Sequence, residues 1–237
     1  MVRDPLGEDR GAGWSGSSGS SLRAGRLLDS PPVNAVTHAV FGAGALAGAS
    51  LVLGVEPALY AYPVAGVAAL VPDLDNPRSK LGNGLSPMRS PLLNALTRPL
   101  SWALRAVSFG LFKTVGHRTL THSLLGLAAF AALAWLLWRA VPGPGYGLFV
   151  ALVAGYASHL AADSLNTPGV PLLWPVGGTA RLWPGGIRSG GVAELVVAVI
   201  AVAVAGYLAY LVHPVLQDQV DGVLSAALYR ESLTPPL

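Results

Sequence analysis

The chain has 237 residues, of which 52% are hydrophobic and only 11% are charged, whereas an ordinary soluble domain is about 25% charged. This composition predicts an integral membrane protein and excludes a typical soluble domain. The absence of cysteine excludes disulfides and thiolate metal ligands, and the small net charge of +3 gives no reason to expect nucleic acid as a partner.

Apolar runs of residues predict an all-α, polytopic membrane helix bundle with about five transmembrane helices. Residues 1–31 precede them as a flexible, Gly/Ser-rich polar tail without the apolar core of a signal peptide. The membrane-embedded domain is expected over 32–213, and a short C-terminal tail over 214–237; His213 at their boundary has no evident partner and is interpreted as structural or exposed. The runs cover about 35–55, 58–71, 124–141, 146–165 and 192–212, and the second is short for a full span.

The connection over 76–118 is long and basic. Between Leu92 and Phe112, apolar residues alternate with Arg98 and Arg105, and Pro99 interrupts the pattern. This predicts an interfacial amphipathic helix, although a helix packed on the bundle fits equally well. The pattern does not decide whether the segment spans, re-enters or lies on the membrane.

Ionisable residues stand where the apolar runs begin or end, and in a membrane protein such residues indicate a functional site. His38 lies in the first turn of the first run, and Asp73 and Asp75 follow the second run directly after Pro72. In extended backbone, residues i and i+2 point to the same side, so both carboxylates can face one ion. Alternatively, His38 bonds a neighbouring group, and the two aspartates are solvated loop residues or a helix cap.

The densest polar cluster is Gly116-His117-Arg118-Thr119-Leu120-Thr121-His122-Ser123, directly before the third run. A separation of five residues puts His117 and His122 off a common helix face. We therefore expect one on the loop and one in the first helical turn, with Thr119 or Thr121 as the cap.

Two further polar positions belong to the last two runs. His159 and Asp163 are at positions i and i+4 near the end of the fourth run, so they are neighbours on one helix face. They can bind one metal together, the aspartate can orient the histidine, or the pair is a plain surface hydrogen bond. Glu194 is the only acid of the fifth run and lies in its first turn, where the helix dipole alone could account for it.

Up-and-down threading of five spans places all these ionisable residues at one membrane face. Thirteen of the fifteen Lys and Arg residues fall in segments on that face, which predicts that it is cytoplasmic, with the N-terminus inside and the C-terminus outside. The loop over 166–190 also falls there, and its Trp174 and Trp183 suit an interfacial loop that could form a wall of the site.

Imidazole and carboxylate groups without thiolate suit zinc, manganese or iron, and zinc or manganese is favoured here. The candidate ligands exceed the needs of one ion, so the site is expected to hold one or two divalent metal ions. Two-metal sites stabilise both the attacking and the leaving oxygen in phosphoester hydrolysis. The predicted ligands are His38, Asp73, Asp75, His117, His122, His159 and Asp163.

The chain resembles the YdjM-like family of membrane-bound, metal-dependent hydrolases, known for SOS-regulated members. The resemblance rests on Thr37-His38, Pro72 to Asp75, His117 to Ser123, Ser158-His159-Leu160 with Asp163, and Gly169 to Pro175, and more loosely on Arg188-Ser189-Gly190 with Glu194. It implies a multi-pass inner-membrane protein whose His and Asp residues bind metal for hydrolysis.

The expected function is therefore a metal-dependent hydrolase at the cytoplasmic membrane face, acting on a small-molecule or lipid phosphoester or another lipid-linked substrate, with membrane lipids as surroundings. Arg118 and Glu194 are the expected catalytic residues, and Arg118 would stabilise developing negative charge. The alternatives are a metal or ion transporter, and a membrane protein with a structural metal.

Overall fold

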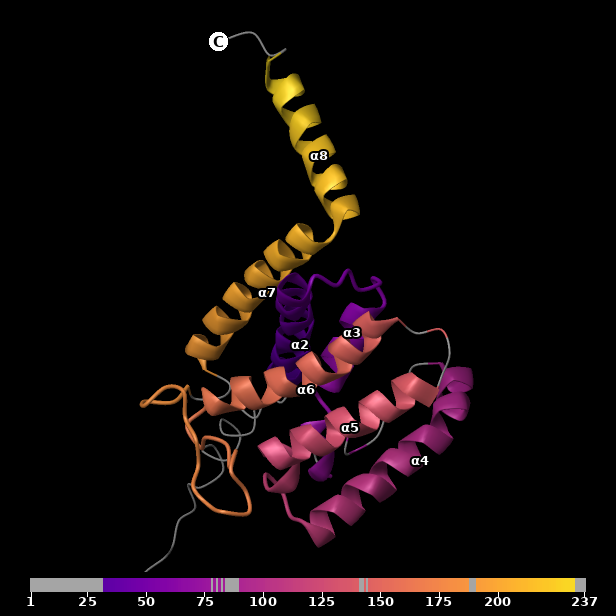
Figure 1. Ribbon diagram of the computed structural model, residues 1–237, viewed down its shortest axis with the longest axis vertical. Helices are drawn as coiled ribbons and strands as arrows, with labels where there is room; N and C mark the ends of the chain where they lie inside the picture. Colours follow the sequence, from indigo (N-terminus) through magenta and orange to yellow (C-terminus); the bar gives the residue numbers. More distant parts are fainter. Residues whose placement is uncertain are drawn as a thin grey trace, which may run out of the picture. The chain divides into compact units, whose positions relative to one another are not determined.

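A computed structural model describes residues 32–77, 79, 81, 83, 90–140, 143, 145–187 and 191–232. These residues form seven α-helices and two short 3₁₀ helices, joined by loops with two isolated β-bridges (Figure 1). The predicted all-α class is therefore confirmed. The elements are α2 (Pro32–Leu53), α3 (Ala61–Ala68), η2 (Pro72–Asp75), α4 (Pro91–Thr114), η3 (Leu120–His122), α5 (Leu124–Ala140), α6 (Tyr146–Ser164), α7 (Val192–Val212) and α8 (Pro214–Ser232).

Within the described residues, two helices are long and apolar enough to cross a membrane: Ala35–Leu53 of α2 and Val192–Val212 of α7. Helix α5 is a shorter apolar helix. Helix α3 has only eight residues, about 12 Å at 1.5 Å per residue, and is far too short to cross a hydrocarbon core of about 30 Å. The second apolar run therefore does not form a full span by itself, and the total of five spans stays a prediction.

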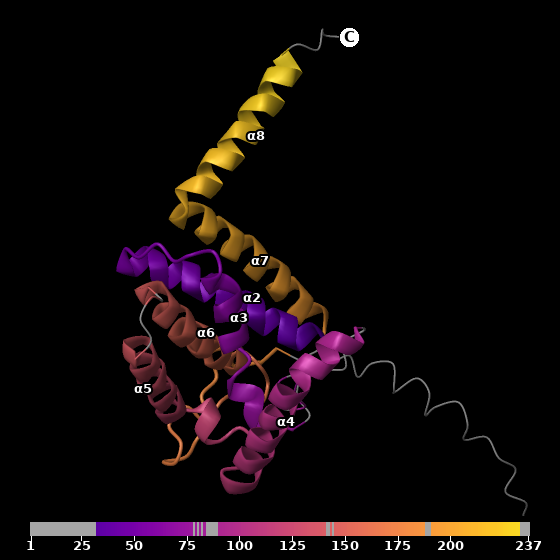
Figure 2. The ribbon, with the colours of Figure 1, turned by 90° about the vertical axis from the view of Figure 1, so that its right-hand side faces the viewer.

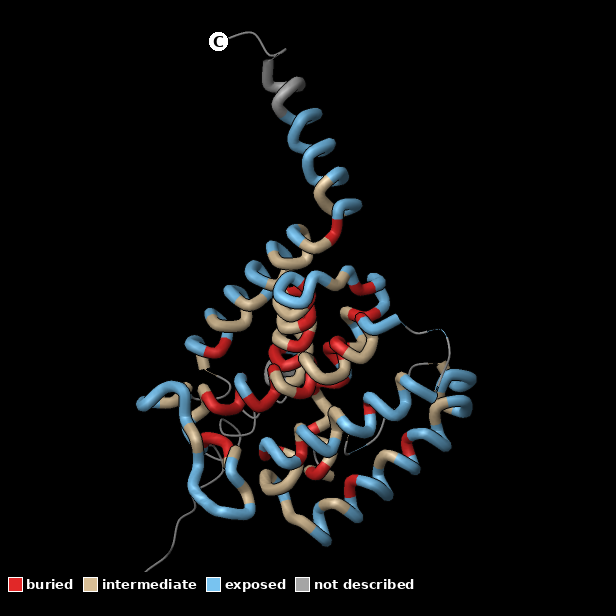
Figure 3. Tube along the Cα trace, in the orientation of Figure 1, coloured by how far each residue is buried: buried red, intermediate tan, exposed pale blue. Residues whose placement is uncertain are grey.

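Helix α2 lies at the centre of the packing and contacts α3, α6 and α7, while α5 packs against α6 (Figures 1 and 2). Small residues allow this close approach: a Cβ atom at either Gly42 of α2 or Gly155 of α6 would overlap the carbonyl oxygen of Ala65 in α3. Buried residues gather where these three helices meet (Figure 3). This core fixes the positions of α2 and α6 relative to each other. The candidate site lies near the start of α2 and the end of α6.

Helix α4 shows the packing on the bundle that was one expected alternative for the basic connection, and the interfacial position stays a prediction. It packs against η2 through a side that buries Ser101 and Ser108, while Leu92, Leu96 and Leu100 are exposed. The helix runs continuously through Pro99, where an interruption was expected. Its apolar side is therefore turned away from the bundle, as suits a helix in contact with lipid.

The C-terminal segment differs from the expected short tail, because residues Pro214–Ser232 form helix α8. His213, just before it, has partners after all. It is 5% exposed, its Nε2 lies 3.0 Å from the hydroxyl of Tyr62, and its Nδ1 lies 3.6 Å from a carboxylate oxygen of Glu56. His213 thus connects the end of α7 to the α2–α3 region.

Candidate metal centre

The predicted polar residues come from separate elements and lie together at one end of the bundle. Helix α2 begins at Pro32, so His38 falls in its second turn rather than its first. Asp73 and Asp75 come from η2, His122 is the last residue of η3, and His159 and Asp163 lie in the last turns of α6. His117 and Arg118 lie in the turn that precedes η3.

Two groups of side chains in the described residues have the spacing of metal ligands. One contains His38, His159 and Asp163, and the other contains Asp73, His122 and His159. In each group the ligand atoms lie within 4.8 Å of one another. His159 belongs to both groups, so the arrangement fits one ion held by part of the set or two ions that share this neighbourhood.

The hydrogen bonds of His159 and His122 place the proton of each ring on Nδ1. The Nε2 atoms of the two rings therefore carry lone pairs, and these two atoms face each other. His159 Nδ1 lies 2.7 Å from the carbonyl oxygen of Ala69, which can only accept, so Nδ1 carries the proton. His122 Nδ1 lies 3.1 Å from the Thr121 hydroxyl oxygen and 3.5 Å from a carboxylate oxygen of Asp75. Because the Thr121 hydroxyl donates to Asp75, its oxygen accepts from His122 Nδ1.

The two Nε2 atoms are 3.2 Å apart. Two neutral imidazoles cannot place their lone pairs together without a proton or a cation between them. Two nitrogen ligands on one tetrahedral zinc ion would be separated by about 3.3 Å, given Zn–N bonds of 2.0–2.1 Å. The donor set therefore fits a divalent cation.

Two carboxylates approach the pair of Nε2 atoms. Oδ1 of Asp73 is 3.6 Å from His122 Nε2 and 3.8 Å from His159 Nε2. Oδ2 of Asp163 is 3.8 Å from each of these two nitrogens. Each carboxylate therefore lies within reach of an ion held by the two imidazoles, and this donor set suits zinc or manganese.

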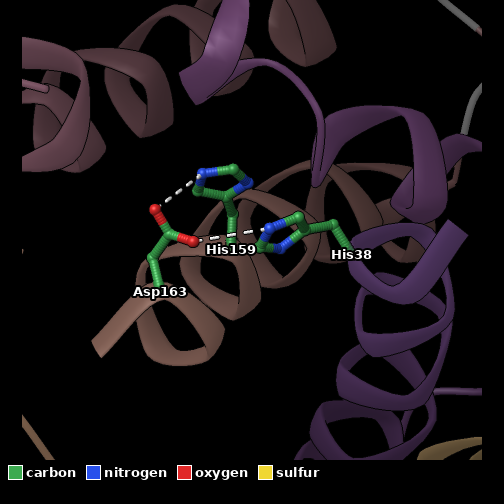
Figure 4. Close-up of side chains that lie close together, drawn as sticks. All are labelled: His38, His159 and Asp163. Carbon is green, nitrogen blue, oxygen red and sulfur yellow. Dashed lines mark ion pairs between the residues drawn. The ribbon is translucent and has the colours of Figure 1, made fainter. Parts of the chain in front are cut away.

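His38 extends the site toward α2 (Figure 4). Its ring stacks on that of His159 with centroids 4.1 Å apart, and its Nε2 lies 3.4 Å from Oδ1 of Asp163. The Nδ1 atom of His38 is buried without a hydrogen bond, which is costly for a polar atom. That atom could be satisfied by a water, or the ring could turn to ligate an ion.

Asp73 and Asp75 do not face one ion together, contrary to the expectation from extended backbone. Pro72–Asp75 is a 3₁₀ helix, in which residues two apart point in different directions. Asp73 therefore approaches Nε2 of His122, and Asp75 approaches its Nδ1. The two carboxylates hold the same imidazole from opposite edges.

Asp75 is fully buried and accepts hydrogen bonds from three residues between His117 and Thr121. It accepts a hydrogen bond from His117 Nδ1 at 2.8 Å, from the Arg118 backbone N–H at 2.9 Å, and from the Thr121 hydroxyl. Asp75 and His117 lie outside both ligand groups. Their contacts are those of residues that orient a ligand from behind.

Arg118 has an unusual backbone with φ of 57°, a left-handed conformation that is uncommon outside glycine and often found at functional sites. This conformation lets its backbone N–H reach Asp75 while its guanidinium pairs with Asp163. Arg118 therefore lies against the ligand set without being a ligand, because guanidinium offers only donors.

The loop carboxylates and His122 shift one another's pKa. Burial opposes the charged form of His122, but the hydrogen bonds and charges of Asp73 and Asp75 outweigh it and raise the pKa of His122 to about 9. Burial likewise opposes ionisation of the aspartates, but hydrogen bonds from His117 and His122 bring the pKa of Asp75 well below its usual range, and His122 and His159 lower the pKa of Asp73. Without metal, a proton on His122 can therefore occupy the place between the two Nε2 atoms.

Glu194 lies near the ligands but is not among them. It is buried in the first turn of α7 and lines a small cavity of about 20 Å³ together with Thr37, His38 and Asn166. Asn166 in turn donates to Oδ1 of Asp163 at 3.1 Å. The loop after α6 thus connects Glu194 to the candidate metal centre.

Several supporting groups carried no clear sequence signal. The carbonyl of Ala69 is backbone, so residue type could not reveal it. Tyr156 donates to the carbonyl of Thr121 at 2.6 Å, and only its place one helical turn before His159 hinted at this. The start of α5 is capped by Ser123, whose hydroxyl accepts from the Gly126 N–H at 3.1 Å, rather than by Thr119 or Thr121.

Comparison with known proteins identifies relatives of this chain. A family described as "YdjM inner membrane protein" matches residues 33–219. The chain is 38% identical over 116 residues to inner membrane protein YdjM of Escherichia coli (strain K12), which is 48% of each chain, and to the same degree to its Shigella flexneri counterpart. It is 30% identical over 178 residues to the uncharacterized protein YvsG of Bacillus subtilis (strain 168), covering 75% of this chain and 95% of that one.

The alignment with the two YdjM proteins spans about half of their length, and no solved structure is significantly similar to the chain. The family match, by contrast, extends from the start of α2 into α8 and includes every residue of the candidate metal centre. The chain therefore belongs to the family of YdjM inner membrane proteins.

Proposed function

We propose that the protein is a multi-pass membrane hydrolase that depends on one or two divalent metal ions and acts on a phosphoester or lipid-linked substrate. The observation that carries this proposal is the close approach of His122 Nε2 and His159 Nε2, with carboxylate oxygens of Asp73 and Asp163 within 3.8 Å of both nitrogens. A divalent ion bound there supplies Lewis-acid chemistry and an activated water.

The exposure of the ligands favours a catalytic over a structural ion. The side chains of His122, His159 and Asp163 are at most 3% exposed, but that of Asp73 is 31% exposed. Structural zinc sites are closed by protein ligands, whereas catalytic sites keep a position for water or substrate. The candidate centre has its open side at Asp73.

The remaining polar residues can support hydrolysis without binding the ion. Arg118 is partly exposed beside Asp163, and its guanidinium has further N–H groups that can donate to a negatively charged substrate oxygen. Glu194 is buried beside His38 and can hold or transfer a proton. His117 and Asp75 hold His122 in the orientation that leaves Nε2 free.

The arrangement of α2 and α7 supports the proposed orientation in the membrane. Thr37 and Leu195 line one groove near the starts of the two helices, and Gly44 approaches Ala205 farther along both, so the helices run parallel. If both cross the membrane, the chain between them must cross an odd number of times. Three such crossings would give the proposed five spans, provided that the turns on either side of α3 complete the crossing of the second run. The proposed orientation, with the N-terminus and the site in the cytoplasm and the C-terminus outside, rests on the distribution of Lys and Arg.

A metal or ion transporter is the second candidate. Transporters hold their ions near the middle of the membrane on broken helices. Here the ligands lie near the start of α2, at the end of α6 and on the two 3₁₀ helices, which favours a site at one face. Ion flux across vesicles without hydrolysis would support transport instead.

The decisive experiment is purification in mild detergent, elemental analysis, and a screen of phosphoester and lipid substrates before and after chelation. We expect activity to vanish with chelator and to return when metal is added. His122→Ala and Asp163→Ala should remove bound metal, whereas His213→Ala is a matched control, because His213 is also a buried histidine but contacts Tyr62 and Glu56. Equal metal content in all three variants would exclude this centre.

A further inference from the structure

An apolar groove opens beside the candidate metal centre, between the N-terminal halves of α2 and α7. Val36, Thr37 and Val40 line it on one side, and Leu195, Ala198, Val199 and Val202 line it on the other. Its volume is about 480 Å³. Among the described residues that line it, Thr37 is the one with a polar side chain, so the groove suits hydrocarbon.

The groove adjoins the site. Thr37 also lines the small cavity that holds His38 and Glu194. Along the chain, Leu195 follows Glu194 and Thr37 precedes His38. On each helix, a residue that lines the groove is therefore adjacent in sequence to a polar residue of the small cavity. A molecule in the groove would therefore have one end close to the proposed ligands.

The other end of the groove is closed by helix contact. Beyond Val202 the two helices converge, and a Cβ at Gly44 would lie only 3.1 Å from the Cβ of Ala205. The lining of α7 from Leu195 to Val202 extends about 10 Å along the helix axis. The helices thus separate only next to the site, where a single chain can enter from the side.

We propose that this groove binds the hydrocarbon tail of the substrate, so that the substrate class is a long-chain lipid phosphoester whose headgroup reaches the metal centre. This inference rests on the proposed hydrolase function. A second apolar groove of about 680 Å³ lies between α2 and α3; Tyr62 and Val67 line it, and it shares Val36 and Val40 of α2 with the first groove. Among the described residues, none that lines it also lines the cavity beside His38, whereas Thr37 lines both that cavity and the first groove.

The test uses the full chain reconstituted in phosphatidylcholine vesicles with two photoreactive probes. One is a long-chain alkyl phosphonate with a diazirine at the end of the chain, and the other is the alcohol of the same chain. The phosphonate cannot be hydrolysed at its C–P bond, so its labelling is independent of turnover. We expect the phosphonate to label α7 around Val199 and Val202, which line this groove but not the second one, more strongly than the alcohol does.

Matched variants assign the labelling to the groove. Ala198→Phe fills the groove and should lower phosphonate labelling several-fold, and Val202→Phe, at a more exposed position, should lower it as well. Ala203→Phe adds the same bulk at an exposed position of α7 outside the groove and should leave labelling unchanged. Metal content of each variant reports that it is folded.

Equal labelling by the phosphonate and the alcohol would show ordinary bilayer contact and overturn the proposal. Labelling centred on Tyr62 and Val67 would overturn it in favour of the second groove. A protein that hydrolyses only water-soluble phosphoesters keeps the proposed function but loses this substrate class. A protein that hydrolyses no phosphoester loses the proposed function, while the labelling pattern still decides whether the groove binds an anionic lipid.

Discussion

Asp75→Asn tests whether a buried carboxylate behind His122 sets the affinity of the metal centre. Asp75 is fully buried and lies 3.5 Å from His122 Nδ1. Asparagine keeps one acceptor oxygen for the Arg118 N–H and the Thr121 hydroxyl, so the turn should still form. The substitution removes the negative charge that makes His122 a stronger base. His117 is 35% exposed, so water can satisfy its Nδ1.

Removal of a group that orients a metal ligand typically costs about 10–100-fold in metal affinity, which corresponds to about 1.4–2.8 kcal/mol. We expect a loss of that size for Asp75→Asn, measured by competition with a chromophoric chelator. In the metal-free protein, the pKa of His122 should fall from about 9 toward its ordinary value, as followed by histidine NMR signals. Asp221→Asn on exposed α8 is the charge-matched control. Unchanged metal affinity together with an unchanged pKa of His122 would refute the reasoning.

Four further predictions follow from the same contacts. Metal affinity should rise about tenfold per pH unit up to about pH 9, because His122 must lose a proton to bind metal; a flat pH profile in metal titrations would contradict this. Arg118→Ala should keep the metal content measured by elemental analysis and lower turnover by about 100–1000-fold, and full turnover would exclude its proposed role. Reporters fused after α8 and within the connection before α4 should lie on opposite membrane sides; fusions reporting the same side would disprove the topology. Gly155→Val should push α3 away from α6, because its side chain would overlap the carbonyl of Ala65, and should lower thermal stability and metal content. Gly206→Val, with open space around its Cβ, should do neither.

The helices were predictable where an apolar run is bounded by proline or glycine. The fifth run and the third end within one residue of α7 and α5. The second run, expected to be short for a full span, contains a still shorter helix, because Leu59–Tyr60 and Ala69–Leu70 form turns although their residues are as apolar as those of the helix between them. Hydrophobicity indicates an apolar environment, but it does not distinguish helix from turn inside a packed bundle.

The meeting of the site residues could also be predicted, because it depends only on which ends of the runs carry ionisable groups. Their individual roles could not be. Asp73 and Asp75 have the same residue type and similar surroundings in the sequence, yet the 3₁₀ geometry of η2 turns one toward the two Nε2 atoms and the other toward His117. Local backbone geometry, rather than residue type, separates the candidate ligand from the residue that supports it.

Pro72 removes one of the backbone donors that could otherwise satisfy a carbonyl of the site. A carbonyl in the last turn of a helix lacks an intrahelical partner unless a later N–H approaches it. Pro72 follows Ala69 by three residues and has no N–H to donate. The carbonyl of Ala69 instead accepts from His159 Nδ1 at 2.7 Å, and this bond fixes the tautomer that directs Nε2 toward His122. The end of an eight-residue helix therefore sets which nitrogen of His159 is free, and with it where a metal ion can bind.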